Sequence, residues 1–333
     1  MPALVHVSDD EPGIERHGRS RFQYVRQTNR KPVRSGRDLD RINALAIPPA
    51  WTDVWICADP QGHIQATGRD ARGRKQYRYH PAYRRRRERR KFDQLVPFGE
   101  ALGPLRAEVD RDLRHPRLDR ERVLAAVISL LELTYIRIGN KAYARDNRSY
   151  GLTTLRCSHV DVDGSQLRLH FRGKGGKWTD VTCCDPRLAR VVRRCQELPG
   201  QQLFQYQDDD GTTAHLTSTD VNDYLREITG LDATAKTFRT WGATLMAAEM
   251  LADVQPPESQ RAATLVANDV LRDVAARLGN TLAVCRASYV HPVVLDSFAS
   301  GALRDEWESG PARGRNRLTA PERRLLRLLS TAT

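Results

Sequence analysis

The segment SHVDVDGSQLRLHFRGKGGKWTDVTC, residues 158–183, interrupts a chain that otherwise has mainly helical patterns from about residue 92 onward. Apolar and polar residues alternate over three short runs, which is the pattern of half-buried strands. Asp163-Gly164 and the glycine-rich stretch around Lys174 separate the runs, and both are turn sequences. The segment therefore predicts a three-stranded β-hairpin element within a helical domain.

Helical patterns lie on both sides of this element. Residues 119–140 place apolar residues at helical spacing and end near Gly139. Residues 218–230 begin at Ser and Thr capping residues and end at Gly230. Further helices are predicted over 235–253, 257–280 and 320–329. Together these segments predict a larger, mainly helical domain that covers residues 91–333.

The N-terminal part of the chain has a different pattern. Short alternating runs occupy residues 53–60, 62–68 and 74–80, and turn sequences rich in Gly, Pro and Asp separate them. We expect a small sheet meander in a β-rich domain over residues 1–90. The fold class is therefore α+β, with a small N-terminal sheet domain followed by the larger helical domain.

Positive charge is concentrated near the N-terminus. The chain of 333 residues has a net charge of +13, and residues 1–91 hold 21 Lys and Arg against 10 Asp and Glu, a net +11. Such a local excess indicates a polyanion as partner rather than a merely basic surface. Arg predominates, and it can hold a phosphate through two parallel hydrogen bonds. The cations do not line one face of an amphipathic helix, which argues against a membrane surface.

Two basic stretches are candidates for contact with nucleic acid. In residues 74–80 the alternation puts Lys75, Tyr77 and Tyr79 on one face of a strand. Aromatic residues among long donors suit a DNA-facing surface, although an ordinary half-buried strand explains the pattern equally well. In residues 83–91 seven of nine residues are positive, which fits either a solvated helical face or a linker along a phosphate backbone.

The composition argues against several other classes of protein. No stretch approaches the ~20 apolar residues that span a bilayer, and the N-terminus lacks a basic flank before an apolar run. We therefore expect a soluble, cytoplasmic protein with no membrane partner. The six cysteines form no C-x-x-C pair and the histidines are scattered, so we expect reduced thiols and no metal. No P-loop sequence is present, and we expect no cofactor.

A few polar residues have ordinary explanations when taken one at a time. Arg137 ends a predicted helix, where a cation is common, and Lys174 occupies a hairpin turn. Lys236 and Arg239 share a face near the start of a predicted helix, where partial positive charge favours a phosphate. Tyr289 lies in a short helical pattern, and most such tyrosines only pack and make one hydrogen bond. Their order along the chain is what distinguishes the set.

The order Arg, hairpin Lys, K-x-x-R and late Tyr resembles that of the type IB DNA topoisomerases, specifically the small bacterial and poxvirus kind. The stretches NALAIPPAWTDVWI (43–56) and GHIQATGRDARGRKQYRYH (62–80) resemble their N-terminal domain, so the resemblance covers most of the chain. It implies duplex DNA as partner and cleavage without ATP or metal. It also implies a DNA-clamp domain (1–90) and a catalytic domain (91–333). We expect a monomer in which these domains close around DNA as a clamp, and we expect the protein at the nucleoid.

The resemblance implies a role for each residue of the set. Tyr289 is similar to the nucleophile that forms a 3′-phosphotyrosyl bond, and Arg137 and Arg239 are similar to the arginines that hold the non-bridging phosphate oxygens. Lys174 is similar to the hairpin lysine that protonates the leaving 5′ oxygen. Asn280 stands where many family members have a histidine, and its amide can donate a hydrogen bond but brings no charge.

Further DNA contacts are expected outside this catalytic set, from the charge pattern and from the family's use of the same strand. The residues expected to make them are Arg74, Lys75, Gln76, Tyr77, Tyr79, Arg84, Arg85, Arg86 and Lys236.

Elementary chemistry supports these roles, and three alternatives remain open. One is a phosphodiesterase or nuclease, which would release cut ends. Fixed guanidiniums stabilise charge that builds on phosphate oxygens, and nearby cations ease deprotonation of a tyrosine whose ordinary pKa is about 10. A tyrosine recombinase or integrase shares the nucleophile, but it usually has H-x-x-R where this chain has Lys236-Thr237-Phe238-Arg239. A non-catalytic DNA-binding protein would share the basic N-terminal part and has no need of the catalytic set.

Overall fold

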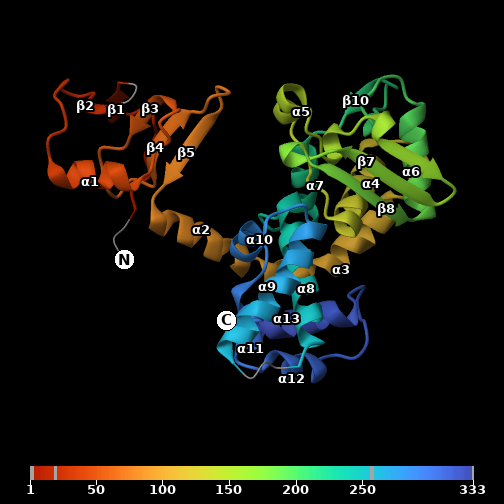
Figure 1. Cartoon of the computed structure of the whole chain (residues 1–333). Coiled ribbons are helices and arrows are strands. Elements are labelled where there is room, and N and C mark those ends of the chain that lie inside the picture. Colours follow the sequence, from red (N-terminus) through yellow and green to blue (C-terminus); the bar gives the residue numbers. More distant parts are fainter. Residues whose placement is uncertain (1–3, 19–20, 256–258, 332–333) are drawn as a thin grey trace. The chain divides into compact units, whose positions relative to one another are not determined.

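The computed structural model describes residues 4–18, 21–255 and 259–331 of the chain. They fall into two compact units, residues 1–91 and residues 92–333, each with its own hydrophobic core (Figure 1). The first unit is built on a sheet, and the second is mainly helical with a small sheet. The predicted α+β fold class is therefore confirmed.

The first unit contains a five-stranded antiparallel sheet in the order β2-β1-β3-β4-β5. Helix α1 (Gly36–Ala44) packs on it through the buried Ile42, and Ser35 caps the start of that helix. The predicted meander corresponds to β3, β4 and β5, whereas β1 and β2 were not predicted, because each is only four residues long and rich in polar residues. The strands are β1 (Ile14–His17), β2 (Gln23–Arg26), β3 (Thr52–Ile56), β4 (Ile64–Arg69) and β5 (Lys75–Tyr79).

An N-terminal arm lies along this sheet. The Val5 N–H donates to the carbonyl of Gln61 at 3.0 Å, and the His63 N–H donates to the carbonyl of Val5 at 2.8 Å. Further along the arm, Asp9 accepts a hydrogen bond from Thr67 at 2.8 Å and forms an ion pair with Lys75 at 2.6 Å. The arm therefore brings a carboxylate to β5.

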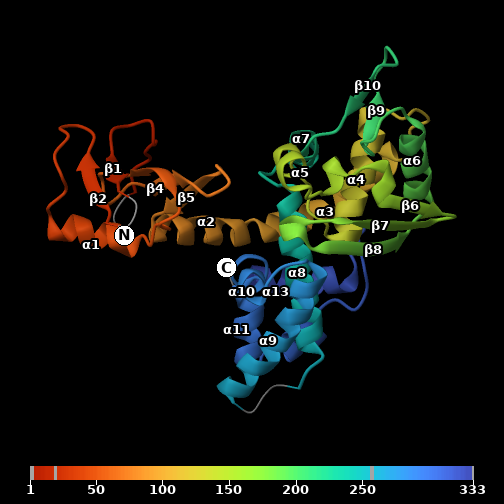
Figure 2. The ribbon, with the colours of Figure 1, turned by 45° about the horizontal axis from the view of Figure 1, so that its top comes forward.

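The second unit is built around helix α4 (Arg120–Thr134), which packs against four other helices (Figure 2). Its residues 123–128 are entirely buried, because the helix is apolar on all sides. The other long helices are α3 (Leu95–Asp112), α6 (Pro186–Glu197), α7 (Ser218–Thr229), α8 (Ala235–Ala252), α9 (Gln260–Arg277) and α13 (Ala320–Thr331). The shorter ones are α5 (Lys141–Asn147), α10 (Leu282–Ser288), α11 (Pro292–Ala299) and α12 (Leu303–Glu308).

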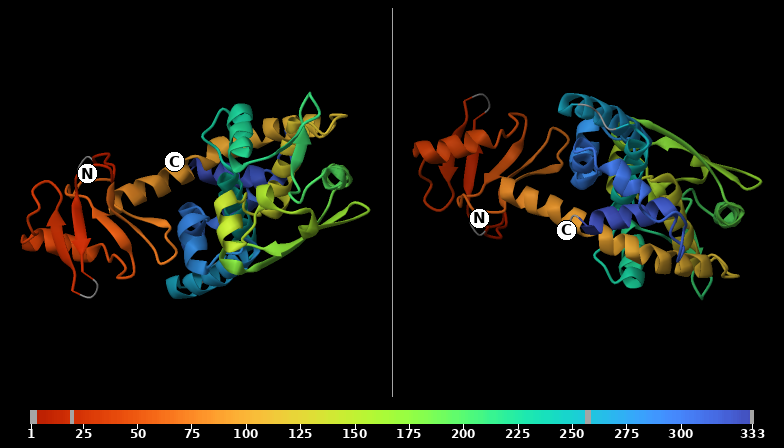
Figure 3. Two further views of the ribbon diagram at one scale, coloured as in Figure 1. Left: turned by 90° about the horizontal axis from the view of Figure 1, so that it is seen from above. Right: turned by 90° about the horizontal axis from the view of Figure 1, so that it is seen from below.

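The predicted three-stranded element is present in the second unit. Strands β6 (Val160–Asp163), β7 (Gln166–Arg172) and β8 (Trp178–Cys184) pair antiparallel, and the turn between the first two contains Gly164 with φ of 53°. Alternate residues of β7 are buried, which leaves the other face of the sheet exposed. A second hairpin, β9 (Gln205–Gln207) and β10 (Thr213–His215), was not predicted because its strands are only three residues long. Figure 3 shows these strands (yellow to green) and the C-terminal helices (blue) in separate parts of the unit.

The helix predicted over residues 119–140 ends earlier than expected. Helix α4 stops at Thr134, and Tyr135 adopts a left-handed conformation with φ of 52°. The reason is tertiary, because the Tyr135 ring packs directly on Gly242, where an added Cβ would lie 2.1 Å from the ring. Arg137 consequently lies in an irregular segment after the helix and not at the helix end.

The other predicted helices agree with the structure within a few residues. Helices α7, α8 and α13 match the predicted segments, and Gly230 closes α7 in the left-handed conformation. Helix α9 ends at Arg277 and is followed by Gly279 with φ of 61°. Residues 257 and 258, at the predicted start of α9, lie outside the described residues.

Helix α2 (Pro81–Asp93) contains the basic run, so the stretch that fitted either a helix or a linker is helical. A search of the described residues found no helix that is both long and apolar enough to cross a membrane.

Candidate active site

Two backbone segments hold the guanidinium of Arg239. This side chain extends from the second turn of α8 and is only 3% exposed. Its Nη1 donates to the carbonyl of Tyr135, and its Nη2 donates to the carbonyl of Leu278 at 2.7 Å. Burial lowers the pKa of Arg239, but an arginine with two carbonyl acceptors keeps its charge at neutral pH. The guanidinium is therefore fixed in position.

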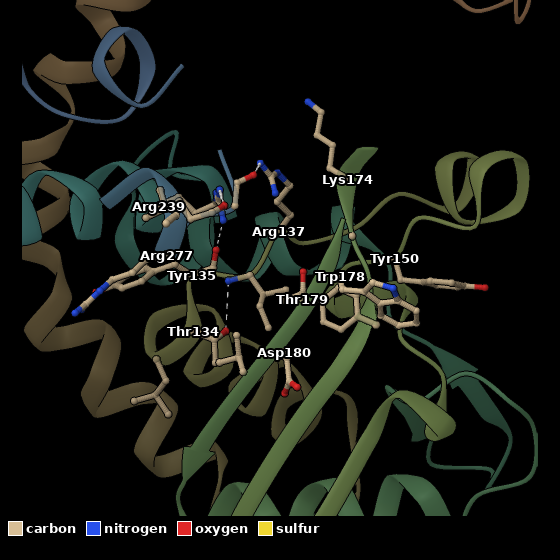
Figure 4. Close-up of a pocket in the computed structure, with 18 of the residues that line it drawn as sticks. Thr134, Tyr135, Arg137, Tyr150, Lys174, Trp178, Thr179, Asp180, Arg239 and Arg277 are labelled. Atoms are coloured by element: carbon tan, nitrogen blue, oxygen red, sulfur yellow. Dashed lines mark hydrogen bonds between the residues drawn. The ribbon is translucent and has the colours of Figure 1, made fainter. Parts of the chain in front are cut away.

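The same two segments also hold Arg137. Its Nη2 donates to the carbonyl of Gly279 at 3.1 Å and to Oδ1 of Asn280 at 2.5 Å. The segment after α4 thus supplies one arginine and an acceptor for Arg239, and the segment after α9 supplies acceptors for both arginines. Figure 4 shows the two guanidiniums side by side. The structure brings together Arg137, Arg239 and Asn280, which are far apart in the sequence.

The Nδ2 atom of Asn280 is buried and has no hydrogen-bond partner in the described part of the chain. The Nε atom of Arg239 is in the same condition. Buried donors are normally paired. Two unpaired donors at this position, one on Arg239 itself and one on Asn280 next to Arg137, therefore indicate a place for an anion.

Tyr289 lies against the cations of α8. It is the residue that follows α10, and its N–H donates to the carbonyl of Cys285 at 2.9 Å. The Arg239 guanidinium carbon is 5.2 Å from the centroid of the Tyr289 ring, and Lys236 Nζ is 5.8 Å from it. Burial acts to raise the pKa of Tyr289. The charge and hydrogen bonding of Arg239, together with the charges of Lys236 and Arg137, outweigh burial and lower the pKa below its ordinary value. The lowered pKa makes loss of the phenol proton easier than in an ordinary tyrosine.

Lys174 lies apart from this cluster. It begins the turn between β7 and β8, where Gly175 and Gly176 both have positive φ. Its side chain is exposed, and no hydrogen bond or ion pair to it occurs among the described residues. In Figure 4 the Lys174 side chain rises from the hairpin turn, and its tip stands apart from Arg137 and Arg239. The structure therefore assembles four of the five predicted catalytic residues and leaves the lysine outside.

A cavity of about 460 Å³ lies between the hairpin and the arginines. Lys174 and Trp178 line it on the hairpin side, and Arg137, Arg239 and Arg277 line it on the helical side. Leu133, Ile136, Phe171, Val181 and Met246 contribute apolar surface to its wall. The cavity is the space that separates Lys174 from the other candidate residues.

The polar candidates at the start of β5 already have partners. Arg74 forms an ion pair with Asp70 at 2.7 Å, and Gln76 donates to the same carboxylate at 2.9 Å. Lys75 is paired with Asp9. These side chains are positioned at the surface, but their hydrogen-bonding groups are engaged within the unit.

The remaining candidates are more open. Tyr77 is 42% exposed and stacks on Tyr79, with ring centroids 5.8 Å apart and an interplanar angle of 7°. The predicted placement of these two rings on one face of β5 is confirmed. On α2 the side chains of Arg84, Arg85 and Arg86 are exposed, and within the described residues no carboxylate pairs with them.

Sequence reasoning missed the groups that orient the site. The acceptors for the arginines are main-chain carbonyls, which no sequence pattern reveals. Thr244 is buried on α8 and contacts the backbone of Tyr289, but a single threonine in an apolar helix gives no distinctive signal. Among the described residues, no group of three or more His, Cys, Asp or Glu side chains is arranged to hold a metal ion.

Two family models match this chain. The model for the catalytic core of eukaryotic DNA topoisomerase I matches residues 80–304, and the model for the N-terminal domain of bacterial DNA topoisomerase IB matches residues 21–70. The first match contains all the candidate catalytic residues.

Individual relatives agree with the family models. DNA topoisomerase 1B of Acanthamoeba polyphaga mimivirus is 33% identical over 285 residues, which are 84% of this chain and 84% of that protein. DNA topoisomerase 1B of Vaccinia virus (strain Western Reserve) is 23% identical over 134 residues, 39% of this chain and 43% of that protein. DNA topoisomerase 1 of Mycosarcoma maydis is 23% identical over 177 residues, 47% of this chain and 17% of that protein. These matches show that the chain belongs to the type IB DNA topoisomerases, a family of isomerases.

Proposed function

We propose that this enzyme relaxes supercoiled duplex DNA by cutting one strand, allowing rotation and resealing the cut. The observation that carries the proposal is the position of the Tyr289 ring against Lys236 and Arg239, with Arg137 beside them. A merely structural tyrosine has no need of three cations that lower its pKa. The same arrangement favours a catalytic protein over a non-catalytic DNA-binding protein.

In the cleavage step the Tyr289 phenol loses its proton to solvent, and its Oη attacks the phosphorus of a phosphodiester. A bond forms between Oη and phosphorus, and the bond from phosphorus to the 5′ oxygen breaks, which leaves a 3′-phosphotyrosyl ester and a free 5′ hydroxyl. Charge that builds on the non-bridging oxygens is stabilised by Arg137 and Arg239, because both guanidiniums are already fixed. Asn280 adds a neutral donor through its unpaired Nδ2.

The leaving 5′ oxygen takes a proton, and we assign its delivery to Lys174. Among the described residues the amino group has no partner to release, and the glycines of its turn allow the backbone to move. Closing the cavity between the hairpin and the arginines would bring Lys174 to the phosphate when DNA binds. In the reverse step the 5′ hydroxyl returns its proton to Lys174 and attacks the phosphorus, and the bond from phosphorus to the Tyr289 Oη breaks. The tyrosine leaves as a phenolate, so resealing needs neither ATP nor metal.

We further propose that residues 1–90 form a DNA-clamp domain, residues 91–333 form the catalytic domain, and a monomer closes around duplex DNA. Support comes from the net charge of +11 in residues 1–91 and from the exposed arginines of α2. A cytoplasmic enzyme that associates with the nucleoid is consistent with such a substrate.

The test is covalent trapping of the Tyr289→Phe variant and the parent enzyme on a duplex labelled at the 5′ end of the cleaved strand. The parent is expected to leave a denaturant-resistant adduct that maps to the peptide with Tyr289, and Tyr289→Phe is expected to leave none while binding DNA with a Kd within about twofold of the parent. A further readout is relaxation of plasmid in EDTA without ATP. An adduct at another residue would overturn the proposal, and products that require paired sites would indicate a recombinase.

A further inference from the structure

Thr244 makes contacts that join the backbone around the nucleophile to helix α8. Its side chain is fully buried, and its Oγ1 lies 3.1 Å from the carbonyl oxygen of Tyr289 and 2.7 Å from that of Thr240. The same oxygen accepts a hydrogen bond from the N–H of His291 at 3.1 Å. One hydroxyl therefore contacts the chain on both sides of Val290.

The backbone of Tyr289 needs this support because α10 has ended. Tyr289 has φ of −132° and ψ of −27°, outside the helical range, so its carbonyl has no acceptor role in that helix. The N–H groups of Tyr289 and Val290 both turn back to the carbonyl of Cys285, at 2.9 Å and 3.2 Å. Helix α10 thus holds the N–H groups of this turn. The Thr244 hydroxyl shares its one proton between the carbonyls of Thr240 and Tyr289, and so contacts the turn from α8.

We propose that Thr244 is a positioning residue for the nucleophile. It keeps the distance between the Tyr289 phenol and the cations of α8 constant. The inference rests on the proposed role of Tyr289. Arg239 and Thr244 are five residues apart on one helix, about 7.5 Å along its axis at 1.5 Å per residue. The helix therefore carries both the group that the phenol faces and the group that anchors the phenol's own backbone.

Thr240 provides a matched control on the same helix. It is also buried, at 1% exposed, but among the described residues its hydroxyl donates only to the carbonyl of Lys236 within α8, at 3.2 Å. Replacing either threonine by valine removes one buried hydroxyl at nearly constant volume. Only the change at Thr244 also removes a contact with the turn that carries Tyr289.

The experiment compares full-length Thr244→Val, Thr244→Ser and Thr240→Val with the parent. Single-turnover cleavage is measured at saturating enzyme on a labelled duplex, together with the Kd for that duplex, the thermal midpoint and the dependence of the cleavage rate on pH. We expect Thr244→Val to cleave at least about tenfold more slowly with a Kd within twofold of the parent. Its rate–pH curve should move to higher pH, because the phenol is held less closely to the cations. Thr244→Ser and Thr240→Val should cleave within about threefold of the parent.

Several results would overturn the proposal. They are an unchanged cleavage rate in Thr244→Val, or an equal loss in Thr240→Val. If Thr244→Val does not fold, Thr244→Ala and Thr244→Ser replace it. The proposal then fails if the single-turnover cleavage rate of Thr244→Ser is less than about fivefold that of Thr244→Ala. Failure of the nucleophile assignment is seen separately, as covalent trapping by Tyr289→Phe.

Discussion

Tyr289 is subject to two opposing effects. Burial disfavours the phenolate, whereas Arg239, Lys236 and Arg137 favour it, and the cations prevail. The balance depends on position, because the attraction between charges falls with distance while the cost of burial remains. Small displacements of the ring or of one cation are therefore expected to alter the pH range in which the phenol can react.

Replacing Lys236 tests this balance. Lys236→Met removes one of the charges that lower the pKa of Tyr289, so the phenol should need a higher pH to lose its proton. We expect the single-turnover cleavage rate to rise with pH in both proteins, and the rising part of the curve to lie at higher pH in Lys236→Met. Burial raises the pKa of nearby Tyr135 to about 12, so that residue does not titrate in the same range.

The exposed Lys31 supplies a control for loss of one positive charge. Lys31→Met should leave the rate–pH curve unchanged. An identical curve for Lys236→Met would mean that Lys236 does not act on the phenol.

At the scale of elements, the junction of α4 and α8 sets the position of both arginines. The Tyr135 ring packs on Gly242, and the Tyr135 carbonyl accepts a hydrogen bond from Arg239. Arg137 follows Tyr135 by two residues. This junction depends on a glycine inside an apolar helix, where any side chain would collide with the ring.

Gly242→Ala tests the junction. The added Cβ would lie 2.1 Å from the Tyr135 ring, so the ring must shift. We expect the free energy of unfolding to fall by about 1–3 kcal/mol, as is usual for overpacking, and the cleavage rate to fall as well. Urea denaturation and single-turnover cleavage measure the two effects.

Gly36→Ala is the comparison, because Gly36 begins helix α1 and a Cβ added there would have no atom within 4 Å. That change should leave both quantities unchanged or raise stability slightly. A Gly242→Ala variant with parental stability would contradict the packing argument.

An element could be predicted from the sequence when the residues that determine it are close together along the chain. The β6–β8 element was predicted because alternation and turn residues occur within 26 residues. The end of α4 was predicted wrongly because it depends on contact between Tyr135 and Gly242, over a hundred positions apart. The candidate side chains were found through resemblance to a family, whereas the carbonyls that orient them and the carboxylates that pair with β5 required the structure.

At the scale of the whole molecule, charge is divided unequally between the two units. Residues 1–91 carry +11 and the remaining residues carry +2. Within the first unit, Arg74 and Lys75 at the start of β5 are paired with carboxylates, whereas Arg84, Arg85 and Arg86 of α2 have no such partners among the described residues. An ion pair must be broken before a cation can bind phosphate, so the two groups should contribute differently to DNA affinity.

The salt dependence of binding separates these contributions. Each phosphate neutralised adds about 0.9 to the slope of log K against log salt concentration. Replacing Arg84, Arg85 and Arg86 with Gln should therefore lower the slope by up to about 2.7, and replacing Arg74 and Lys75 should lower it by less than the ~1.8 expected of unpaired cations. Fluorescence anisotropy with a labelled duplex between about 50 and 200 mM salt measures both. Equal loss per residue in the two variants would show that the pairing on β5 does not matter.

The chemical nature of the acceptors that hold Arg137 and Arg239 affects which mutations the site can tolerate. Three of the four acceptors, at Tyr135, Leu278 and Gly279, are main-chain oxygens, which every amino acid possesses. No missense change can delete such an atom, so descendants of this gene can vary their side chains there and still orient the guanidiniums, provided that the backbone keeps its path. Asn280 is the exception, and drift at that codon reaches the chemistry directly.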